Sequence, residues 1–396
     1  MTLAINGGSP VRKSYLPYGK QCIEEDDIKA VVEVLNSDYL TTGPKVLEFE
    51  EKLKNYVGSK YAVAVQNGTA ALHLAVMALN LEKGDEVITT PMTFAASSNC
   101  ILYCGLKPVF VDINKENYNI DINLIESKIT KKTKAIIPVD FTGQAVDMDS
   151  IMCIADQYNL KVIEDAAHSI GSKYKGKMVG SLSHMTTFSF HPVKTITTGE
   201  GGGITTNDKD FYEKLLLFRS HGITRNKEWL GNKEEGSWYY EQLEIGYNYR
   251  ITDIQCALGI SQLDKIDKFI KRRKEIVKIY NCELSKIDGV ILQKEESFSD
   301  TCNHLYIIRL ELDKFSATRN EIFNALKAEN IGVNLHYIPV YYHPFYKNLR
   351  YEKGICPHAE SLYESIITLP LHYSMIDQDI FDVIEAVNKV LGYYRN

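Results

Sequence analysis

The feature that most constrains the fold is an alternation of short apolar segments and helical segments between residues 61 and 218. Short runs rich in β-branched and aromatic residues, at 61–65 and 86–89, alternate with segments of helical periodicity such as 94–103. Strands that alternate with helices pair in parallel and are covered by helices on both faces. The sequence therefore predicts an α/β fold with a mainly parallel central sheet.

The same patterns predict how the rest of the chain is divided. Further strands are predicted at 108–111, 135–139, 161–163, 185–190 and 202–205, and further helices at 24–36, 45–57, 121–129, 148–158 and 208–218. We expect an N-terminal arm (1–25), a large α/β domain (26–255), a linking helix (256–285, within a helical pattern at 252–285) and a smaller C-terminal α+β domain (286–396). In the last domain, strands are predicted at 304–312 and 332–335 and helices at 318–329 and 377–390.

Composition excludes several classes of function. The net charge of -6 and the absence of a basic stripe speak against nucleic acid as a partner. The longest apolar run, 70–81, contains His73 and is too short to cross a bilayer, so no membrane contact is expected. The first eight residues lack the pattern of a signal peptide, and the eight cysteines form no Cys-x-x-Cys pair. A reduced, cytoplasmic protein is the resulting expectation.

One lysine, Lys194, lies on a loop between two predicted strands. The stretch 186–206 begins as an apolar run, breaks at His191-Pro192, and ends in Gly199-Glu200-Gly201-Gly202-Gly203. A lysine held between buried strands is removed from water, which lowers its pKa and makes its amine a nucleophile able to form a Schiff base. Taken alone, the stretch also fits a solvated lysine beside a hairpin turn.

Two further features follow predicted strands. Asn67-Gly68-Thr69 opens a helix, whose free N–H groups and threonine hydroxyl suit a phosphate. Asp165, after the strand at 161–163, is expected at the mouth of a site beyond the carboxyl ends of the strands. A buried carboxylate there needs a cation, and a protonated pyridine nitrogen is one. Each feature alone also fits an ordinary helix cap.

Together, in this order along an α/β chain, the three features predict a site for pyridoxal 5′-phosphate (PLP). The chain has no Gly-x-x-x-x-Gly-Lys-Ser/Thr phosphate loop, and no Gly-x-Gly-x-x-Gly follows its first strand. Its histidines show no tight metal-ligand spacing, so no metal site is predicted.

Motifs along nearly the whole chain resemble the DegT/DnrJ/EryC1/StrS sugar aminotransferase family of fold-type I PLP enzymes. The matching stretches include Asn6-Gly7-Gly8, Asn67-Gly68-Thr69-Ala70-Ala71-Leu72, Glu164-Asp165-Ala166-Ala167-His168, Ser189-Phe190-His191-Pro192-Val193-Lys194, Gly246-Tyr247-Asn248-Tyr249-Arg250, His304-Leu305-Tyr306 and Leu335-His336-Tyr337-Ile338-Pro339. Within the family, the stretch 188–202 and Trp238-Tyr239-Tyr240-Glu241 are most similar to the transaminases of pseudaminic acid biosynthesis.

The resemblance implies roles for individual residues around the cofactor. Lys194 would bind PLP covalently, and Asp165 would pair with its pyridine nitrogen. Phe94 would stack on the ring, and His168, where many relatives carry glutamine, would lie near its phenolic oxygen. The phosphate would be held by Gly68, Thr69, Ser189 and Asn248 of the partner subunit.

The resemblance also implies a substrate site and a reaction. The positions that match the sugar-nucleotide site are Tyr18, Asp38, Tyr39, Leu40, Thr41, Asn67, Ser189, Asn248, Leu335, His336, Tyr337 and Ile338. The implied reaction moves an amino group from L-glutamate to a UDP-linked 4-keto-6-deoxy-N-acetylhexosamine, in a homodimer with shared active sites. His221 and Arg250 are further candidates for contact with the donor carboxylate or the diphosphate, and a structural role fits each equally well.

Three alternatives stay open from the sequence. One is an aminotransferase for another nucleotide-linked keto sugar, of the bacillosamine, perosamine or legionaminic acid type. A second is a dehydratase of the same family, which is expected to carry histidine in place of Lys194. The third is a non-catalytic sensor with the same fold, which would be expected to have lost Lys194 or Asp165.

Overall fold

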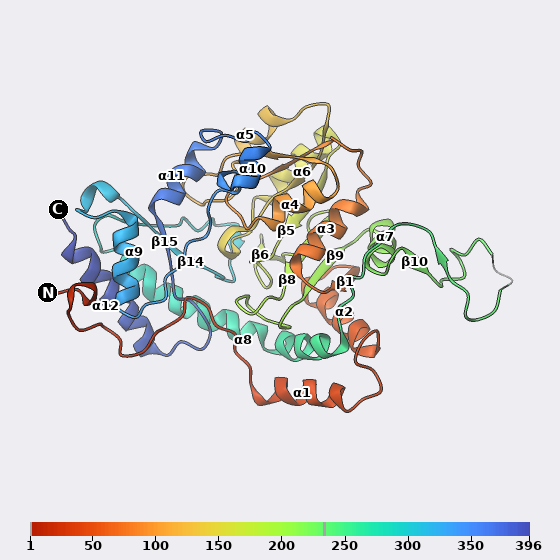
Figure 1. Cartoon of the computed structure of the whole chain (residues 1–396), viewed down its shortest axis with the longest axis horizontal. Helices are drawn as coiled ribbons and strands as arrows, with labels where there is room; N and C mark the ends of the chain where they lie inside the picture. The colour runs from red at the N-terminus through yellow and green to blue at the C-terminus, as the bar shows by residue number, and fades with distance from the viewer. Residues whose placement is uncertain (1, 233–234) are drawn as a thin grey trace.

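A seven-stranded sheet forms the centre of the computed structural model, which describes residues 2–232 and 235–396 (Figure 1). Its strands lie in the order β1 (Tyr61–Val65), β9 (Gly202–Thr206), β8 (Met185–Ser189), β5 (Lys161–Asp165), β4 (Thr133–Ile137), β2 (Glu86–Thr89) and β3 (Lys107–Phe110). β9 runs antiparallel to both neighbours, and every other pair in this sheet is parallel. The predicted mainly parallel sheet is confirmed.

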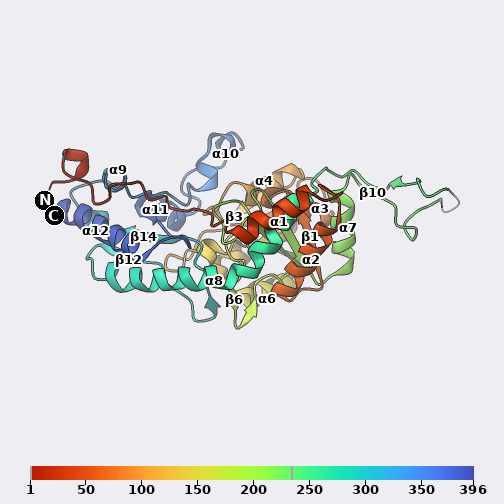
Figure 2. The same cartoon turned by 90° about the horizontal axis from the view of Figure 1, so that it is seen from below.

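Alternate residues of each strand face opposite layers of helices. On β1, Ala62 and Ala64 belong to a core shared with α2, α6 and α8, whereas Val63 and Val65 belong to a core shared with α3, α4 and α7. These helices are α2 (Pro44–Val57), α3 (Gly68–Ala78), α4 (Ala96–Tyr103), α6 (Met148–Tyr158), α7 (Lys209–Arg219) and α8 (Asp253–Leu284). The side view shows the two layers (Figure 2). Burial on both faces explains why the strands are apolar throughout.

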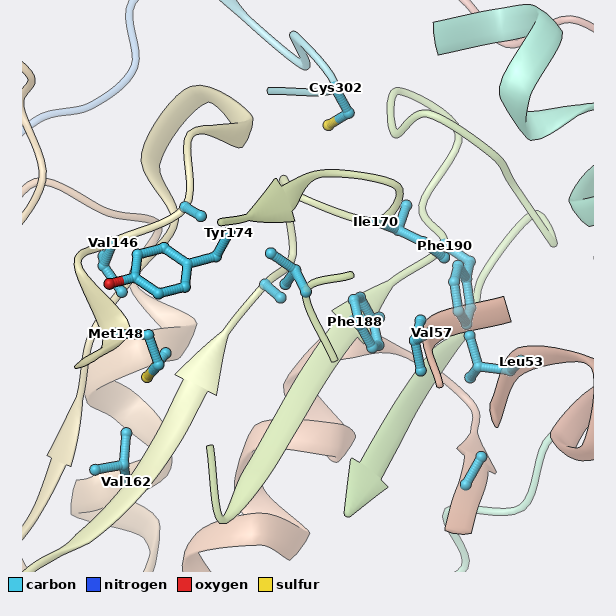
Figure 3. Close-up of a cluster of buried hydrophobic side chains, with 14 of the residues drawn as sticks. Leu53, Val57, Val146, Met148, Val162, Ile170, Tyr174, Phe188, Phe190 and Cys302 are labelled. Carbon is cyan, nitrogen blue, oxygen red and sulfur yellow. The ribbon is translucent and has the colours of Figure 1, made fainter. Parts of the chain in front are cut away.

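The first of these cores is dense in large side chains. Figure 3 shows Phe188 and Phe190, at the end of β8, beside Val57 and Leu53 of α2. Both phenylalanines are fully buried, and the edge of Phe190 meets the ring of Phe49 at a centroid distance of 5.4 Å. This packing holds rigid the point at which the chain leaves β8 and enters the lysine loop.

The 32-residue helix α8 joins the two halves of the molecule, as its continuous helical periodicity predicts (Figure 1). Its first part packs against α1 (Glu25–Leu35) and α2, and Ile276 and Tyr280 belong to the core of the C-terminal half. A capping box starts the helix: Thr252 accepts from the Gln255 N–H, and the Gln255 side chain accepts from the Thr252 N–H. Two N–H groups that lack partners within the helix are thereby satisfied.

Thr252→Ala is expected to lower the free energy of unfolding by about 1 kcal/mol, since it removes the cap acceptor but leaves the core unchanged. Urea denaturation measures the change. Thr252→Ser keeps the hydroxyl and is the matched control, with a midpoint expected near that of the wild type. Equal losses in both variants would contradict the capping argument.

The C-terminal half contains its own antiparallel sheet in the order β12 (Val290–Leu292), β14 (Tyr306–Leu310) and β15 (Ile366–Leu369). Helices α9 (Arg319–Ala328) and α12 (Asp377–Tyr393) cover it, and both chain ends lie at this side of the molecule (Figure 1). Leu3 and Leu16 of the N-terminal arm are buried in the same core. The arm is therefore anchored to the C-terminal half.

Some predicted elements differ from the structure. The segment 332–335 is not a strand: only isolated bridges form, Leu16 with Ile331 and Asn334 with Thr368. Between these bridges the segment changes partner from the arm to β15, so no continuous ladder develops. The predictions also omit short elements, which carry too few residues for a periodic signal: β12, β15, β6 (Lys173–Tyr174), β7 (Lys177–Met178), β13 (Ser299–Asp300), α10 (Pro344–Asn348) and α11 (Pro357–Ser365).

A two-stranded extension projects from the large domain (Figure 1). It pairs β10 (Ile223–Thr224) with β11 (Glu241–Gln242) in antiparallel register. Trp238, which precedes β11, is 72% exposed, and Ile245, which follows β11, is 78% exposed. Two large apolar side chains on a projecting segment have no cover within the described part of the chain.

Candidate active site

A cavity of about 650 Å³ lies at the carboxyl ends of the parallel strands. Asn67 follows β1, Phe94 follows β2, Asp165 ends β5 and Ser189 ends β8, and all four residues line the cavity. The segment at Leu335–Tyr337 of the C-terminal half closes another side. Ligands of open α/β sheets bind at this edge, where loops from several strands converge.

Lys194 lies on the loop between β8 and β9, where the sequence predicts it. A turn fixes its main chain, in which the Lys194 N–H donates to the His191 carbonyl at 2.9 Å. The side chain is half-buried, and burial of its amine lowers the pKa of Lys194 to about 8, although the charge of Asp165 opposes this shift. A substantial fraction of neutral, nucleophilic amine is therefore present near neutral pH.

This pKa leads to a kinetic prediction. Mixing apoenzyme with PLP is expected to give a covalent attachment rate that rises with pH, reaches half of its maximum near the Lys194 pKa of about 8 and levels off above it, because the neutral amine is the reactive form. Stopped-flow absorbance across a pH series measures the rate. A lysine with the ordinary pKa of 10.5 would instead show a rate still rising at pH 10, and that result would contradict the enclosed environment of Lys194.

Asp165 is 3% exposed and has no cation hydrogen-bonded to it in the described structure. Ser97 Oγ donates to its Oδ2 at 2.6 Å, and the Ala167 N–H donates to its Oδ1 at 3.2 Å. Since Ser97 donates to Asp165, the Thr93 hydroxyl, 2.7 Å away, donates to Ser97. Burial raises the pKa of Asp165 despite these hydrogen bonds. Asp165 is thus oriented toward the cavity and ready to pair with a cationic ligand group.

The N-terminus of α3 faces the same cavity. Asn67 caps the helix by accepting from the Ala70 N–H at 2.8 Å, and Gly68 and Thr69 form its first turn. A Cβ on Gly68 would lie 2.9 Å from the Ser189 Cβ, so glycine lets the helix approach the end of β8 closely. The free N–H groups of this first turn and the two hydroxyls of Thr69 and Ser189 make a cradle suited to a phosphate.

Three histidines line the opposite wall: His168, His304 and His336. His168 Nε2 lies 2.9 Å from the Tyr337 hydroxyl, and its ring lies 4.5 Å from the His304 ring. Burial, reinforced by the charge of Lys194, lowers the pKa of each histidine well below its usual range, to about 3 for His336. All three imidazoles are therefore neutral at physiological pH, and the charge of Lys194 acts on every one of them.

The structure brings most, but not all, of the sequence-predicted residues to this cavity. Those that line it are Tyr18, Asn67, Gly68, Thr69, Phe94, Asp165, His168, Ser189, Lys194, Leu335, His336 and Tyr337. Those outside its lining are Asp38, Tyr39, Leu40, Thr41, Asn248 and Ile338, all of them exposed. The further candidates His221 and Arg250 do not line it either. Phe94 lines the cavity and is 63% exposed, so its ring is not packed in the core.

Several lining residues were not predicted as site residues, among them Thr93, Ser97, His304 and Asn334. His304 belongs to the stretch His304-Leu305-Tyr306, which resembles the family, and this resemblance could have indicated His304 as a site residue. Ser97 lies within a predicted helix that gives no sign of a link to Asp165. No group of three or more His, Cys, Asp or Glu side chains suited to a metal ion occurs among residues 2–232 and 235–396. Within the same residues, no helix is both long and apolar enough to span a bilayer.

The residues present fit PLP. A half-buried lysine of lowered pKa can bind an aldehyde, and a buried carboxylate without a cationic hydrogen-bond partner can receive a pyridinium nitrogen. The glycine-opened start of α3 can receive the phosphate, and Phe94 presents an exposed ring to the space between them. The chemistry of this donor set therefore matches each polar end of the cofactor.

The comparisons with known proteins agree with this site. The sequence model of the DegT/DnrJ/EryC1/StrS aminotransferase family matches residues 21–388. The UDP-4-amino-4,6-dideoxy-N-acetyl-beta-L-altrosamine transaminase of Campylobacter jejuni, serotype O:23/36, is 40% identical over 388 residues, covering 96% of this chain and 99% of the relative.

Two solved structures show the same fold. PseC of Helicobacter pylori, an aminotransferase involved in the biosynthesis of pseudoaminic acid, superposes with a TM-score of 0.90 at 33% identity, covering 96% of this chain and 100% of the other. The PLP form of a putative sugar aminotransferase from Streptococcus pneumoniae superposes with a TM-score of 0.88 at 34% identity, covering 96% and 99%.

The fold and the site define a PLP-dependent aminotransferase of fold type I. Within this class, the chain belongs to the DegT/DnrJ/EryC1/StrS aminotransferase family, whose enzymes use PLP. The prediction of fold class, enzyme class and cofactor from the sequence is confirmed.

Proposed function

We propose that the protein transfers the amino group of L-glutamate to C4 of a UDP-linked 4-keto-6-deoxy-N-acetylhexosamine, giving a 4-amino sugar nucleotide of the kind used in pseudaminic acid biosynthesis. The relatives support the more general function, an aminotransferase that acts on nucleotide sugars. The observation that carries the proposal is the joining of Lys194, Asp165 and the start of α3 in one cavity. The 40% identity to the altrosamine transaminase supports the choice of sugar.

We assign the cofactor to named residues. Lys194 would bind the aldehyde, Asp165 would receive the pyridine nitrogen, Phe94 would cover the ring, and Gly68, Thr69 and Ser189 would hold the phosphate. His168 would lie near the phenolic oxygen. When bound, PLP supplies an aldehyde for the incoming amine and a ring that withdraws electrons from the reacting carbon.

The side chains of the protein then act on protons and charge. With the cofactor bound, the Lys194 amine would act as the general base that takes the proton from the α-carbon of the donor, and then as the acid that gives a proton to the former aldehyde carbon of the cofactor. Its lowered pKa suits it to both tasks near neutral pH. Asp165 keeps the ring nitrogen protonated by accepting its hydrogen bond. The same groups act in reverse order on the keto sugar, so one site serves both halves of the reaction.

The residues predicted to bind the sugar nucleotide fall into two groups, and we assign the second group to a site shared with a second copy of the chain. Tyr18, Asn67, Leu335, His336 and Tyr337 line the cavity of their own chain and are assigned to the sugar nucleotide. Asp38–Thr41, Ile338 and Asn248 lie outside it, and we assign them to a site shared across a homodimer. The exposed Trp238 and Ile245 on the projecting segment support such an assembly, because large apolar side chains in solvent favour burial by a partner.

Substrate assays test the proposal. Purified holoenzyme is incubated with ¹⁵N-labelled L-glutamate and a panel of UDP- and GDP-linked 4-keto-6-deoxy sugars, and the products are analysed by mass spectrometry. We expect ¹⁵N in the product of the UDP-linked N-acetylhexosamine. Labelling of a GDP-linked sugar alone would favour the perosamine-type alternative. Labelling of no sugar, with no bleaching of the cofactor by glutamate, would contradict the aminotransferase mechanism.

A further inference from the structure

Behind Asp165, two carboxyl groups meet in the interior of the large domain. Asp140, on the loop after β4, and Glu164, on β5 next to Asp165, are both 0% exposed. The bridge between Val139 and Asp165, which both line the cavity, places the next residues Asp140 and Glu164 as neighbours on the opposite face of the sheet, and each acts on the pKa of the other. Because neighbouring residues of a strand point to opposite faces, Glu164 turns away from the cavity toward Asp140, whereas Asp165 lines the cavity.

The hydrogen bonds around the pair leave one place for a proton. Asp140 Oδ2 accepts from Ser169 Oγ at 2.6 Å, and Oδ1 accepts from the Val146 N–H at 3.0 Å. Glu164 Oε2 accepts from Thr186 Oγ1 at 2.8 Å, whereas Oε1 is buried and finds no donor among the described residues. A proton held between the two carboxyl groups gives Glu164 Oε1 a hydrogen-bond partner. Without this proton, both side chains are carboxylates, which can only accept hydrogen bonds, and no donor lies between them.

The described surroundings offer the pair no compensating positive charge. The titratable neighbours that act on it include Asp165, itself acidic, and the buried Cys302 thiol. Among residues 2–232 and 235–396, no lysine or arginine forms an ion pair with either carboxyl group, whose donors are Ser169, Val146 and Thr186. Two carboxylates in contact without a cation cannot both ionise in a buried site. Burial is the main cause that raises the pKa of both groups, and the charge of Asp140 raises the pKa of Glu164 further. For Asp140, the charge of Asp165 adds to the effect of burial, whereas the contact with Glu164 lowers the pKa, and the result is a value of about 7.

The pair is also connected to the active site through the main chain. The Asp140 N–H donates to the Asp165 carbonyl at 3.1 Å. At the other end of the following turn, the Ser169 N–H donates to the Ala166 carbonyl at 3.0 Å, and the Ser169 hydroxyl donates to the Asp140 side chain. The same turn presents the Ala167 N–H to Asp165 and the His168 ring to the cavity. Asp140 thus holds both ends of the segment 165–169.

We propose that Asp140 and Glu164 share one proton at neutral pH, and that this protonated pair positions Asp165 and the turn that carries His168. The pair touches neither substrate nor cofactor, so both are positioning residues. The effect on catalysis rests on the proposed role of Asp165, whereas the shared proton is independent of it.

Infrared spectroscopy tests the proton directly. The wild-type holoenzyme at neutral pH is expected to show the C=O stretch of a protonated buried carboxyl group, and Glu164→Gln is expected to lose it, because the introduced amide supplies the N–H that Asp140 then accepts. Glu86→Gln is the matched control: Glu86 is 8% exposed but accepts from Lys107 at 3.0 Å and Thr130 at 2.7 Å, so its replacement should leave the band unchanged. Absence of the band from the wild type would overturn the proposal, whatever the variants do.

The pH dependence of stability gives a second test. The pKa values of the pair are raised by folding, so the native state holds a proton that the unfolded state has lost above about pH 5. Its stabilising contribution is present at low pH and disappears as the pH rises through the folded pKa values. As the pH rises above about 5 and through the Asp140 pKa of about 7, the urea midpoint of the wild type should therefore fall more steeply than those of Glu164→Gln and Asp140→Asn. Parallel curves would overturn the shared proton.

The positioning role has its own readout. Glu164→Ala removes both the shared proton and the Thr186 hydrogen bond, and we expect it to shift the pH at which the absorbance of lysine-bound cofactor changes, whereas Glu164→Gln should restore the wild-type value. A purely structural role would lower the stability of Glu164→Ala without moving this pH, and that result would overturn the link to Asp165. Failure of the wild type to transaminate any sugar would count against the proposed function and leave the infrared result standing.

Discussion

Lys194→Ala is expected to abolish covalent binding of PLP and to reduce kcat by at least roughly 10²–10⁴-fold, the contribution typical of a positioned acid–base group. The half-buried Lys194 amine, with its pKa lowered to about 8, is the nucleophile of the cavity and the group we assign to proton transfer. Alanine removes both functions and leaves the packing of the loop intact, since Ile196 and Phe190 beside it remain buried.

Borohydride reduction followed by peptide mass analysis measures the covalent bond, and ¹⁵N transfer from glutamate measures turnover. The wild type should yield one modified peptide, with the cofactor mass on Lys194. Lys177→Ala, an exposed lysine on the β6–β7 hairpin, is the control and should retain the modification and the activity. Cofactor mass on another lysine in the wild type, or turnover that survives in Lys194→Ala, would remove Lys194 from the mechanism.

Asp165→Asn is expected to lower kcat by roughly 10²–10³-fold, an effect of the size found when one electrostatic partner of a transition state is removed. Asparagine keeps the shape of the side chain and can still accept from Ser97, but it carries no charge to hold a proton on the ring nitrogen. We therefore expect a modest loss of cofactor affinity and a large loss of rate.

Cofactor titration and single-turnover kinetics with glutamate separate these two effects. Ser97→Ala removes only the hydrogen bond of 2.6 Å and should cost less, roughly 10-fold, which is the lower end of the effect expected when one hydrogen bond to a charged group is lost. Asp149→Asn, at an exposed surface position, should change neither quantity. Equal rates for Asp165→Asn and the wild type would contradict the assigned pairing with the ring nitrogen.

The sequence predicted the main parts of the site because each is local. A glycine and a threonine at the start of a helix, an acidic residue at the end of a strand, and a lysine between two strands are all visible in short stretches. The topology of parallel sheets then requires that such ends meet at one edge. Gly68, Asp165 and Lys194 accordingly line one cavity.

Other parts depended on contacts between distant segments. Ser97 donates to Asp165 across 68 positions, and the His304 ring contacts the His168 ring, tilted by 47°, although the two residues are far apart in the chain. No local pattern marks either contact. The predicted substrate residues at 38–41 and Asn248 lie outside the lining of the cavity, and no local pattern distinguishes them from the predicted residues that line it.

The sequence by itself determined the fold class, the cofactor, and the lysine and aspartate that line the cavity. It could do so because strand–helix periodicity and the residue types at strand ends are visible in short stretches of neighbouring residues. The tertiary structure alone decided the protonation environment. Lys194 has a low pKa because the walls of the cavity exclude water from its amine. Asp140 and Glu164 form a buried carboxyl pair because two adjacent strands bring them together without a cation. Desolvation and charge proximity are properties of packing, and packing is set by residues distant in the chain.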